Sequence, residues 1–335
     1  SPEMAALQAE LLRTDENYRQ QNWAALYDAN RLNKVTIANA EGAGESVTGL
    51  NSIYIIANER SLNTDAGLNV VVNHTFNPRF TLNGGALYQY YLGKNYKVVD
   101  DLLGGDFFVD WDFLGNFDKP ENQVSRNSDL LHPNNLVRVG DKLGWDYDEN
   151  IRKSSAWAQM QYSLPRFQFF AAVEGGQTQM WRTGHMQNGR FPDNSLGDSE
   201  KLTFTTYGVK GGATFKANGR NYFYVNGYYG TQAPFFRSAF FQARTRDLTL
   251  PNIEVSQTQS IEGGYLLRNP NYKARVTGYL TNFKNETQSI FASQWSVSRV
   301  INELDLASLN LGGNPAALAA ALEQPFFFGS IILQG

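Results

Sequence analysis

The fold of this chain is decided by residues 68–92, which read LNVVVNHTF, NPR and FTLNGGALYQYYL. Apolar and polar side chains alternate on both sides of Asn77-Pro78-Arg79, and an alternation of period two places the two kinds on opposite faces of a β-strand. Proline has no amide hydrogen for a strand ladder, so the tripeptide ends one strand and turns the chain. The stretch predicts a β-hairpin with one apolar and one polar face. We expect Val70 and Leu82 on the apolar face, and Asn73 and Gln89 on the polar one.

The same pattern recurs three times along the chain. The turns are expected at Pro165, at Asn218-Gly219 and at Pro270, and Asn-Gly is a common hairpin turn because both residues tolerate positive φ. Residues 221–229 are too aromatic for their faces to be assigned. On the apolar face of these hairpins we expect Phe169, Val209 and Val276. On the polar face we expect Gln159, Gln161, Glu174, Lys210 and Arg275.

The connections between the expected strands are sorted by length. Those at the four turns are short, whereas those at the other end are long and cover residues 93–152, 183–202, 230–252 and 284–325. Strands of about ten residues with this sorting are typical of an outer-membrane barrel. A soluble β-sandwich, the alternative, has shorter strands and does not sort its turns. We predict an all-β fold, an antiparallel transmembrane β-barrel with short periplasmic turns and long extracellular loops.

Composition agrees with a β-rich protein. The 335 residues include 13% aromatic side chains and 30 glycines, while charged residues make up 18%, below the roughly 25% of average domains. No run approaches the roughly 20 apolar residues of a membrane helix. The net charge of −3 suggests no nucleic-acid partner, and the absence of cysteine excludes disulfides and thiolate ligands. The three histidines are far apart in sequence, so we expect no metal site and no cofactor.

Two N-terminal segments break the alternation. Residues 2–12 and 22–33 have helical spacing, and Asn314-Pro315 opens a third helical segment that ends at Glu323. We expect residues 1–46 to form an extracellular loop with helical segments. Residues 47–335 are expected to form the barrel portion with its long loops.

Two acidic stretches are candidate metal sites. Asp146 to Asn150 resembles the start of a calcium loop, but Ile151 and Trp157 stand where such a loop needs glycine and a carboxylate. The three carboxylates Asp106, Asp110 and Asp112 lie among aromatic residues and could hold a cation or a sugar, although an ordinary folded loop is the preferred interpretation. No nucleophile elbow, phosphate loop or metalloprotease helix is present, so we expect no enzymatic activity.

The candidate binding residues lie in or next to the long loops. The loop after residue 229 is rich in phenylalanine and arginine, and its Phe235, Phe236, Phe240 and Phe241 are too apolar to stand in water. We therefore expect the loop to fold back onto protein and to carry its arginines toward the lumen. The residues predicted to bind a ligand or to contact a plug are Trp181, Arg182, Phe235, Phe236, Arg237, Arg244 and Arg246. Alternatively, the arginines only tie the loop together. Glycine pairs inside the strands indicate bends or a close approach of another segment.

Several segments resemble a known family. Residues 22–31, 181–197, 207–212, 233–240, 244–247 and 262–265 are similar to the barrel domain of TonB-dependent outer-membrane receptors. The resemblance is to the group that carries a carboxypeptidase-like regulatory domain before the plug. It extends from about residue 15 to 284 and says nothing about the ligand.

The resemblance implies a barrel of 22 strands closed by an N-terminal plug, of which this chain would supply about nine or ten strands and no plug. It implies import of a solute across the outer membrane of a Gram-negative cell. The partners would be the TonB energy-transducing complex, reached through the absent plug, outer-membrane lipid, an unknown solute and, as an option, a surface lipoprotein. Two alternatives stay open: a passive pore or structural barrel of an envelope secretion or attachment assembly, and a soluble β-rich carbohydrate-binding module.

Overall fold

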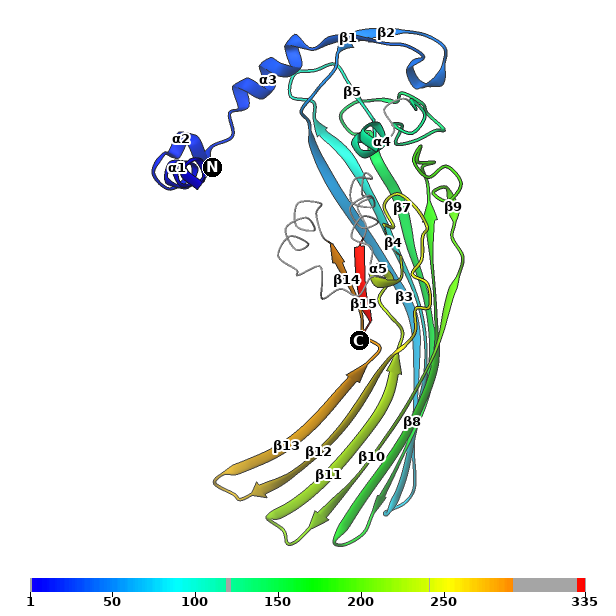
Figure 1. Cartoon of the computed structure of the whole chain (residues 1–335). Helices are drawn as coiled ribbons and strands as arrows, with labels where there is room; N and C mark the ends of the chain where they lie inside the picture. The colour runs from blue at the N-terminus through cyan, green and yellow to red at the C-terminus, as the bar shows by residue number, and fades with distance from the viewer. Residues whose placement is uncertain (1, 119–121, 241, 292–329, 335) are drawn as a thin grey trace, which may run out of the picture. The chain divides into compact units, whose positions relative to one another are not determined.

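The computed structural model describes residues 2–118, 122–240, 242–291 and 330–334 in two compact units. The first, the long-loop unit, comprises Ser1–Ser61, Asn95–Asp146 and His185–Ser195. The second, the sheet unit, comprises Leu62–Lys94, Tyr147–Gly184 and Leu196–Gly335. Figure 1 shows the elements of both. The predicted helix that ends at Glu323 and the residue Phe241 lie outside the described residues.

Antiparallel strands dominate the described part of the chain. The main sheet has nine strands in the order β13-β12-β11-β10-β8-β7-β4-β3, with β9 (Gly197–Asp198) paired to β8. The strands are β3 (Ile56–Asn77), β4 (Phe80–Asp101), β7 (Lys142–Ser163), β8 (Phe167–Gly184), β10 (Leu202–Lys216), β11 (Asn221–Gln232), β12 (Ser256–Arg268) and β13 (Lys273–Lys284). The order begins at β13 and ends at β3, and within the described ranges no pairing joins the two. The antiparallel sheet is therefore confirmed, whereas the barrel closure is not seen.

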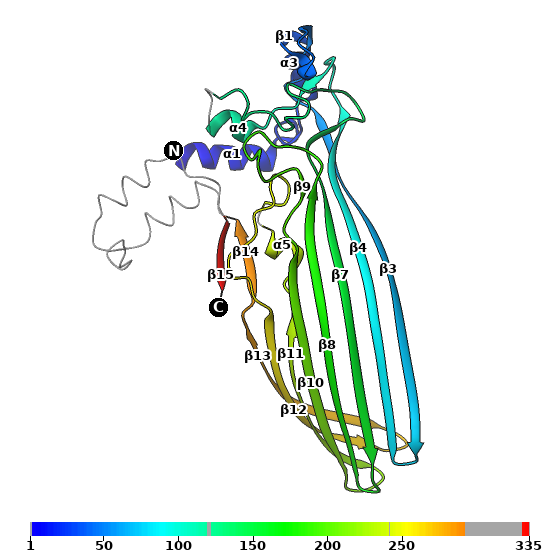
Figure 2. The same cartoon turned by 90° about the vertical axis from the view of Figure 1, so that its right-hand side faces the viewer.

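The four short turns lie at one end of the sheet, as both views show (Figures 1 and 2). Asparagine side chains stabilise two of them. Asn77 Oδ1 accepts hydrogen bonds from the amides of Arg79 and Phe80 at 2.9 and 3.0 Å, and Asn218 Oδ1 does the same for two amides of its own turn. In a turn, such a side-chain oxygen accepts the hydrogen bonds of backbone amides that have no carbonyl partner in the strand ladder. The sorting of turns is confirmed, while their periplasmic position remains a prediction.

Several strands extend into segments that the sequence suggested as loops. β4 continues to Asp101, β7 begins at Lys142 and β8 continues to Gly184. In these extensions the alternation is lost: Val98 and Val99 are neighbours in sequence and are both buried. A strand covered on both faces has no reason to alternate, so its pattern cannot be distinguished from that of a loop.

The strand register separates the apolar and polar side chains. Val209 pairs with Val173 and with Tyr229, whereas Lys210 pairs with Ala172 and Tyr228. Residues that face each other across an antiparallel pair share a face of the sheet. Continued across the sheet, this rule places Phe169 and Val276 on the face of Val209. It places Gln161, Glu174 and Arg275 on the face of Lys210. On β3 and β4, Gln89 Nε2 donates to Asp65, which puts the even-numbered Val70 and Leu82 on the other face from Gln89.

The apolar face of the sheet unit is exposed and bordered by aromatic rings. Val173, Val209 and Val276 are 57%, 49% and 69% exposed, values unusual for side chains in the middle of strands. Near the short turns, aromatic rings pair between neighbouring strands, with Phe167 5.1 Å from Phe215. Toward the other end Tyr207 pairs with Tyr229 at 5.9 Å. Aromatic pairs therefore lie toward both ends of the exposed apolar face.

The long-loop unit contains the two predicted N-terminal helices, α1 (Pro2–Thr14) and α3 (Trp23–Leu32), and a short helix between them, α2 (Glu16–Arg19), which was not predicted. Its other elements are β1 (Lys34–Ile37), η1 (Ala40–Gly42), β2 (Val47–Leu50), β5 (Phe108–Val109), α4 (Phe113–Asp118) and β6 (Leu136–Val137). Asn30 on α3 is fully buried, and its side chain bonds the backbone of Ile53, Tyr54, Leu102 and Leu103. No helix within the described residues is both long and apolar enough to span a membrane.

The acidic residues of the long-loop unit bind backbone groups. Asp106 accepts the Leu50 amide at 2.8 Å, and Asp112 accepts the Leu114 amide at 2.9 Å. Asp110 is 2% exposed, and both its carboxylate oxygens lie 3.0 Å from the Gly144 amide nitrogen. These contacts agree with the folded-loop interpretation. The described residues contain no group of three or more metal-ligating side chains.

Burial of Asp110 predicts a pH dependence. Desolvation raises the pKa of Asp110 to about 6, although the Gly144 amide, the Ser128 side chain and Lys97 oppose this rise and Asp129 adds to it. A raised pKa means that the folded protein binds the proton more tightly than the unfolded chain does. The folded state therefore gains stability as the pH falls through 6 toward the pKa of this carboxyl group in the unfolded chain. Between pH 7 and pH 5 we expect the long-loop unit to gain about 1 kcal/mol, measured as slower hydrogen exchange of its amides.

The matched control for this prediction is Asp110→Asn, which retains an acceptor for the Gly144 amide but cannot ionise. In that variant the slowing between pH 7 and pH 5 should disappear once the intrinsic exchange rates are corrected for. An unchanged pH response in Asp110→Asn would show that another group is responsible.

Candidate functional site

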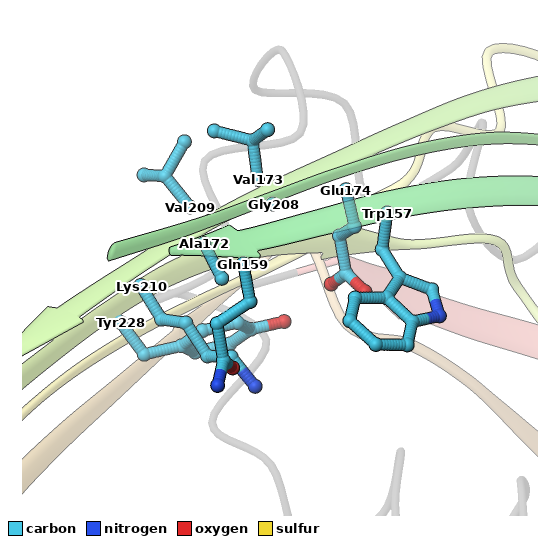
Figure 3. Close-up of a pocket in the computed structure, with 9 residues that line it drawn as sticks. All are labelled: Trp157, Gln159, Ala172, Val173, Glu174, Gly208, Val209, Lys210 and Tyr228. Atoms are coloured by element: carbon cyan, nitrogen blue, oxygen red, sulfur yellow. The ribbon is translucent and has the colours of Figure 1, made fainter. Parts of the chain in front are cut away.

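The polar face of the sheet unit carries a hollow of about 290 Å³ (Figure 3). It is lined by Trp157 and Gln159 of β7, Glu174 of β8, Lys210 of β10 and Tyr228 of β11, with small residues between them. Figure 3 shows Val173 and Val209 pointing to the opposite side of the sheet. The register accounts for the grouping, because Trp157 pairs with Glu174 and Lys210 with Tyr228. Three of the predicted polar-face residues, Gln159, Glu174 and Lys210, are thereby brought together.

Glycines next to the hollow let its large side chains lie across the sheet. A Cβ atom on Gly208 would be 2.5 Å from Glu174 Oε1, and one on Gly85 would be 2.8 Å from Trp157 Nε1. The close approach that the glycine pairs suggested is therefore explained in part by side chains of neighbouring strands. The sequence could not show this, because the contacts depend on the register between strands.

Two other polar-face residues are not part of the hollow. Arg275 Nε donates to the Tyr224 hydroxyl at 2.8 Å, and its guanidinium lies 5.0 Å from the centre of that ring. Gln161 pairs with Phe170, nearer to the short turns. The polar face thus carries at least two separate polar groups, and the hollow with Glu174 and Lys210 is the one with open space beside it.

Farther along the same face, toward the long loops, Arg182 contacts the loop of residues 230–252. Arg182 is 1% exposed, its Nε donates to the Ala243 carbonyl at 2.5 Å and its guanidinium lies 5.6 Å from the Tyr147 ring. Glu149 is its partner across the strand pair. The buried arginine therefore holds the loop against the sheet.

The loop of residues 230–252 places further charged side chains around Arg182, Tyr147 and Glu149. Arg237 interacts electrostatically with Glu149 and Tyr147, Arg244 with Tyr147, and Asp247 with Arg182. Arg246 lies in the same turn, where its amide donates to the Gln242 carbonyl at 3.1 Å. The sequence analysis identified the arginines as candidates but not Tyr147, Glu149 and Asp247, because nothing local in the sequence shows that these residues lie beside Arg182 and Arg237.

The loop folds back onto protein, as its phenylalanines predicted. Its short helix α5 (Phe236–Ala239) buries Phe236 and Ala239, and the Phe236 ring stacks on the Phe240 ring at 4.5 Å. Phe235 contradicts the expectation, because 74% of its surface is exposed. It lines a second hollow of about 280 Å³ together with Lys153, Glu174 and Phe236. Since Glu174 lines both hollows, they lie next to each other on the polar face.

Trp181 lies apart from the loop arginines. It pairs with Asn150, and Arg182 with Glu149, so the two neighbours in sequence point to opposite faces of β8. Trp181 is on the face that carries the apolar band, beneath Arg152 and Lys201. Trp181 and Arg182, both predicted to bind a ligand or to contact a plug, therefore lie on opposite faces, because successive strand residues alternate between faces.

Comparison with known proteins gives one kind of similarity. No protein-family model and no curated protein matches the chain. Among solved structures it is similar to the ferric-catecholate import receptor Fiu from Escherichia coli K12 in its closed form, with a TM-score of 0.41 and 10% identity. The match covers 73% of this chain and 33% of that one, so the chain spans about a third of the receptor's length. A likeness at this level does not define a family or a ligand.

Proposed function

We propose that the chain is part of the wall of an outer-membrane β-barrel that imports a solute in a TonB-dependent manner. The single observation that carries the membrane placement is the division of one sheet into an exposed apolar face and a polar face, with all short turns at one end. Exposed valines in the middle of long strands favour lipid as their neighbour. They disfavour a soluble carbohydrate-binding module.

The loop of residues 230–252 favours selective import over a passive pore. Residues 230–252 are held on the polar face by Arg182, so this face does not leave a fully open channel. Glu174, Lys210 and the exposed ring of Phe235 would recognise a polar solute by hydrogen bonds and ring contacts, without catalysis. Dependence on TonB, on a plug and on any surface lipoprotein rests on the sequence segments that resemble the receptor family.

The decisive experiment compares binding and uptake in cells that carry the full-length protein. A protonophore that collapses the inner-membrane gradient should abolish accumulation of the growth-limiting solute and leave its binding at the cell surface unchanged. Uptake that persists without the gradient would favour the passive pore. Absence of the protein from the outer-membrane fraction would contradict the membrane placement itself.

The loop arginines provide a second prediction. In the full-length receptor, Arg244→Gln together with Arg246→Gln should increase basal ion conductance in planar bilayers by severalfold and change solute affinity little, since Arg244 interacts with Tyr147 of the sheet. Loss of affinity with unchanged conductance would assign these arginines to the solute instead. A variant that changes neither would remove the loop from the proposed site.

A further inference from the structure

Two cations stack on one tryptophan on the apolar-band side of the sheet. The guanidinium of Arg152 and the ammonium of Lys201 each lie 5.0 Å from the centre of the Trp181 ring, and Arg152 also lies 5.8 Å from the Tyr90 ring. Trp181 itself is 6% exposed, whereas both cations are exposed. We call Arg152, Lys201 and Trp181 the Trp181 basic cluster.

Hydrogen bonds beside the cluster connect the strands that carry it, and the cluster itself contains no anionic side chain. The Tyr90 hydroxyl donates to Asn150 Oδ1 at 3.0 Å, and Asn150 Nδ2 donates to Thr183 at 3.1 Å, which supports the strands on which Trp181 and Arg152 lie. In the ranges that the structure describes, neither Arg152 nor Lys201 forms an ion pair. The carboxylate of Asp198, on the short strand β9, accepts a hydrogen bond from Thr183 instead.

Along the strands, the cluster lies at the level expected for the lipid headgroups. Arg152 pairs with Gln179, which is 179 − 167 = 12 residues along β8 from the aromatic row at Phe167. At about 3.3 Å per residue and a strand tilt of about 40°, this separation is about 30 Å along the membrane normal. The apolar band of such barrels is about 25 Å tall, so the cations lie about 5 Å beyond it, on the long-loop side.

We propose that the Trp181 basic cluster binds the phosphate of an anionic lipid headgroup in the membrane leaflet at the long-loop end. This inference rests on the proposed membrane placement and adds a lipid site to it. The planar fork of Arg152 can hold two phosphate oxygens, and Lys201 adds a second charge from the neighbouring segment. Because the cluster and the hollow at Glu174 lie on opposite faces of the sheet, the ligand comes from the bilayer rather than from the lumen.

The test uses the full-length protein purified in a nonionic detergent and titrated with lipid A, with native mass spectrometry counting bound lipid. Wild type should bind diphosphoryl lipid A in preference to lipid A without phosphates. The double variant R152Q/K201Q should bind the diphosphoryl form roughly 30-fold more weakly, at about a fivefold loss for each cation near a charged surface. Millimolar inorganic phosphate should not displace the lipid.

The control R166Q/K216Q removes the same charge at the short-turn end of the sheet and should bind like wild type. Equal weakening in this control would mean nonspecific attraction, and unchanged binding by R152Q/K201Q would rule out the site. Displacement by inorganic phosphate would identify a free-anion site instead. Fractionation of wild-type cells separates the two proposals: a protein that reaches the outer membrane but shows no lipid preference contradicts only the lipid site.

Discussion

Arg182→Gln should release the loop of residues 230–252 from the sheet and lower the free energy of unfolding by roughly 3–5 kcal/mol. The wild-type side chain is almost completely buried, donates to the Ala243 carbonyl and lies against the Tyr147 ring. Glutamine cannot reach the same carbonyl while keeping the ring contact, and Asp247 loses the positive charge with which it interacts. Removing one member of a buried charged group leaves the others uncompensated.

Hydrogen exchange measures this effect locally. The amides of Leu250 and Thr245, which donate to the carbonyls of Ala239 and Gln242, should exchange much faster in Arg182→Gln than in wild type. Arg166→Gln, at an exposed position beside a short turn, is the matched control and should change stability by less than about 0.5 kcal/mol. Arg182→Lys, which keeps the charge without the fork, should lie between the two. Unchanged loop exchange in Arg182→Gln would show that the phenylalanines alone hold the loop.

A released loop has a functional consequence for the proposed importer. The loop lies on the polar face beside the hollow that Phe235 and Glu174 line. If this face lines the lumen, Arg182→Gln should raise basal conductance more than the Arg244 and Arg246 variants do, because Arg182 is almost completely buried and bonds the loop backbone.

Val276→Arg should impair assembly far more than Thr277→Arg, although the two positions are adjacent. Val276 is 69% exposed on the apolar face of β13, and Thr277 lies on the polar face beside Tyr224. Val276 pairs with Tyr265 near the short turns, and an arginine on the lipid-facing surface costs up to roughly 2–4 kcal/mol, less toward the interfaces, whereas a charge on the lumen face costs little. The measurement is the fraction of full-length protein that is folded in the outer membrane, seen as heat-modifiable mobility in cold electrophoresis.

A second polar-face variant is needed as a control, because Thr277→Arg also removes the hydrogen bond between the Thr277 hydroxyl and Tyr224. Tyr279 is 78% exposed and pairs with Glu262, so Tyr279→Arg gains a carboxylate neighbour and should assemble normally. Equal assembly of the Val276 and Tyr279 variants would mean that the apolar face does not meet lipid.

The hairpins and their two faces can be predicted from the amino-acid sequence. Period-two alternation is a local property of a half-covered strand, so Val209 and Lys210 could be assigned to opposite faces without knowing any neighbour. The turns are also local, because Asn77 and Asn218 bond amides only two or three residues away. Helix α3 was equally readable from its spacing, and the fold-back of the loop from its phenylalanines.

How distant segments combine could not be predicted from the sequence, because it depends on tertiary packing. The strand extension with Val98 and Val99 is covered on both faces, so it carries no alternation. Arg182 meets Ala243 across 61 residues, and Trp181 meets Lys201, which directly precedes β10. Both contacts depend on which strands are neighbours and in what register. The same register sends Trp181 and Arg182 to opposite faces. Contacts of this kind arise from packing in three dimensions, and one strand's pattern records only whether a side chain is covered, never by which partner.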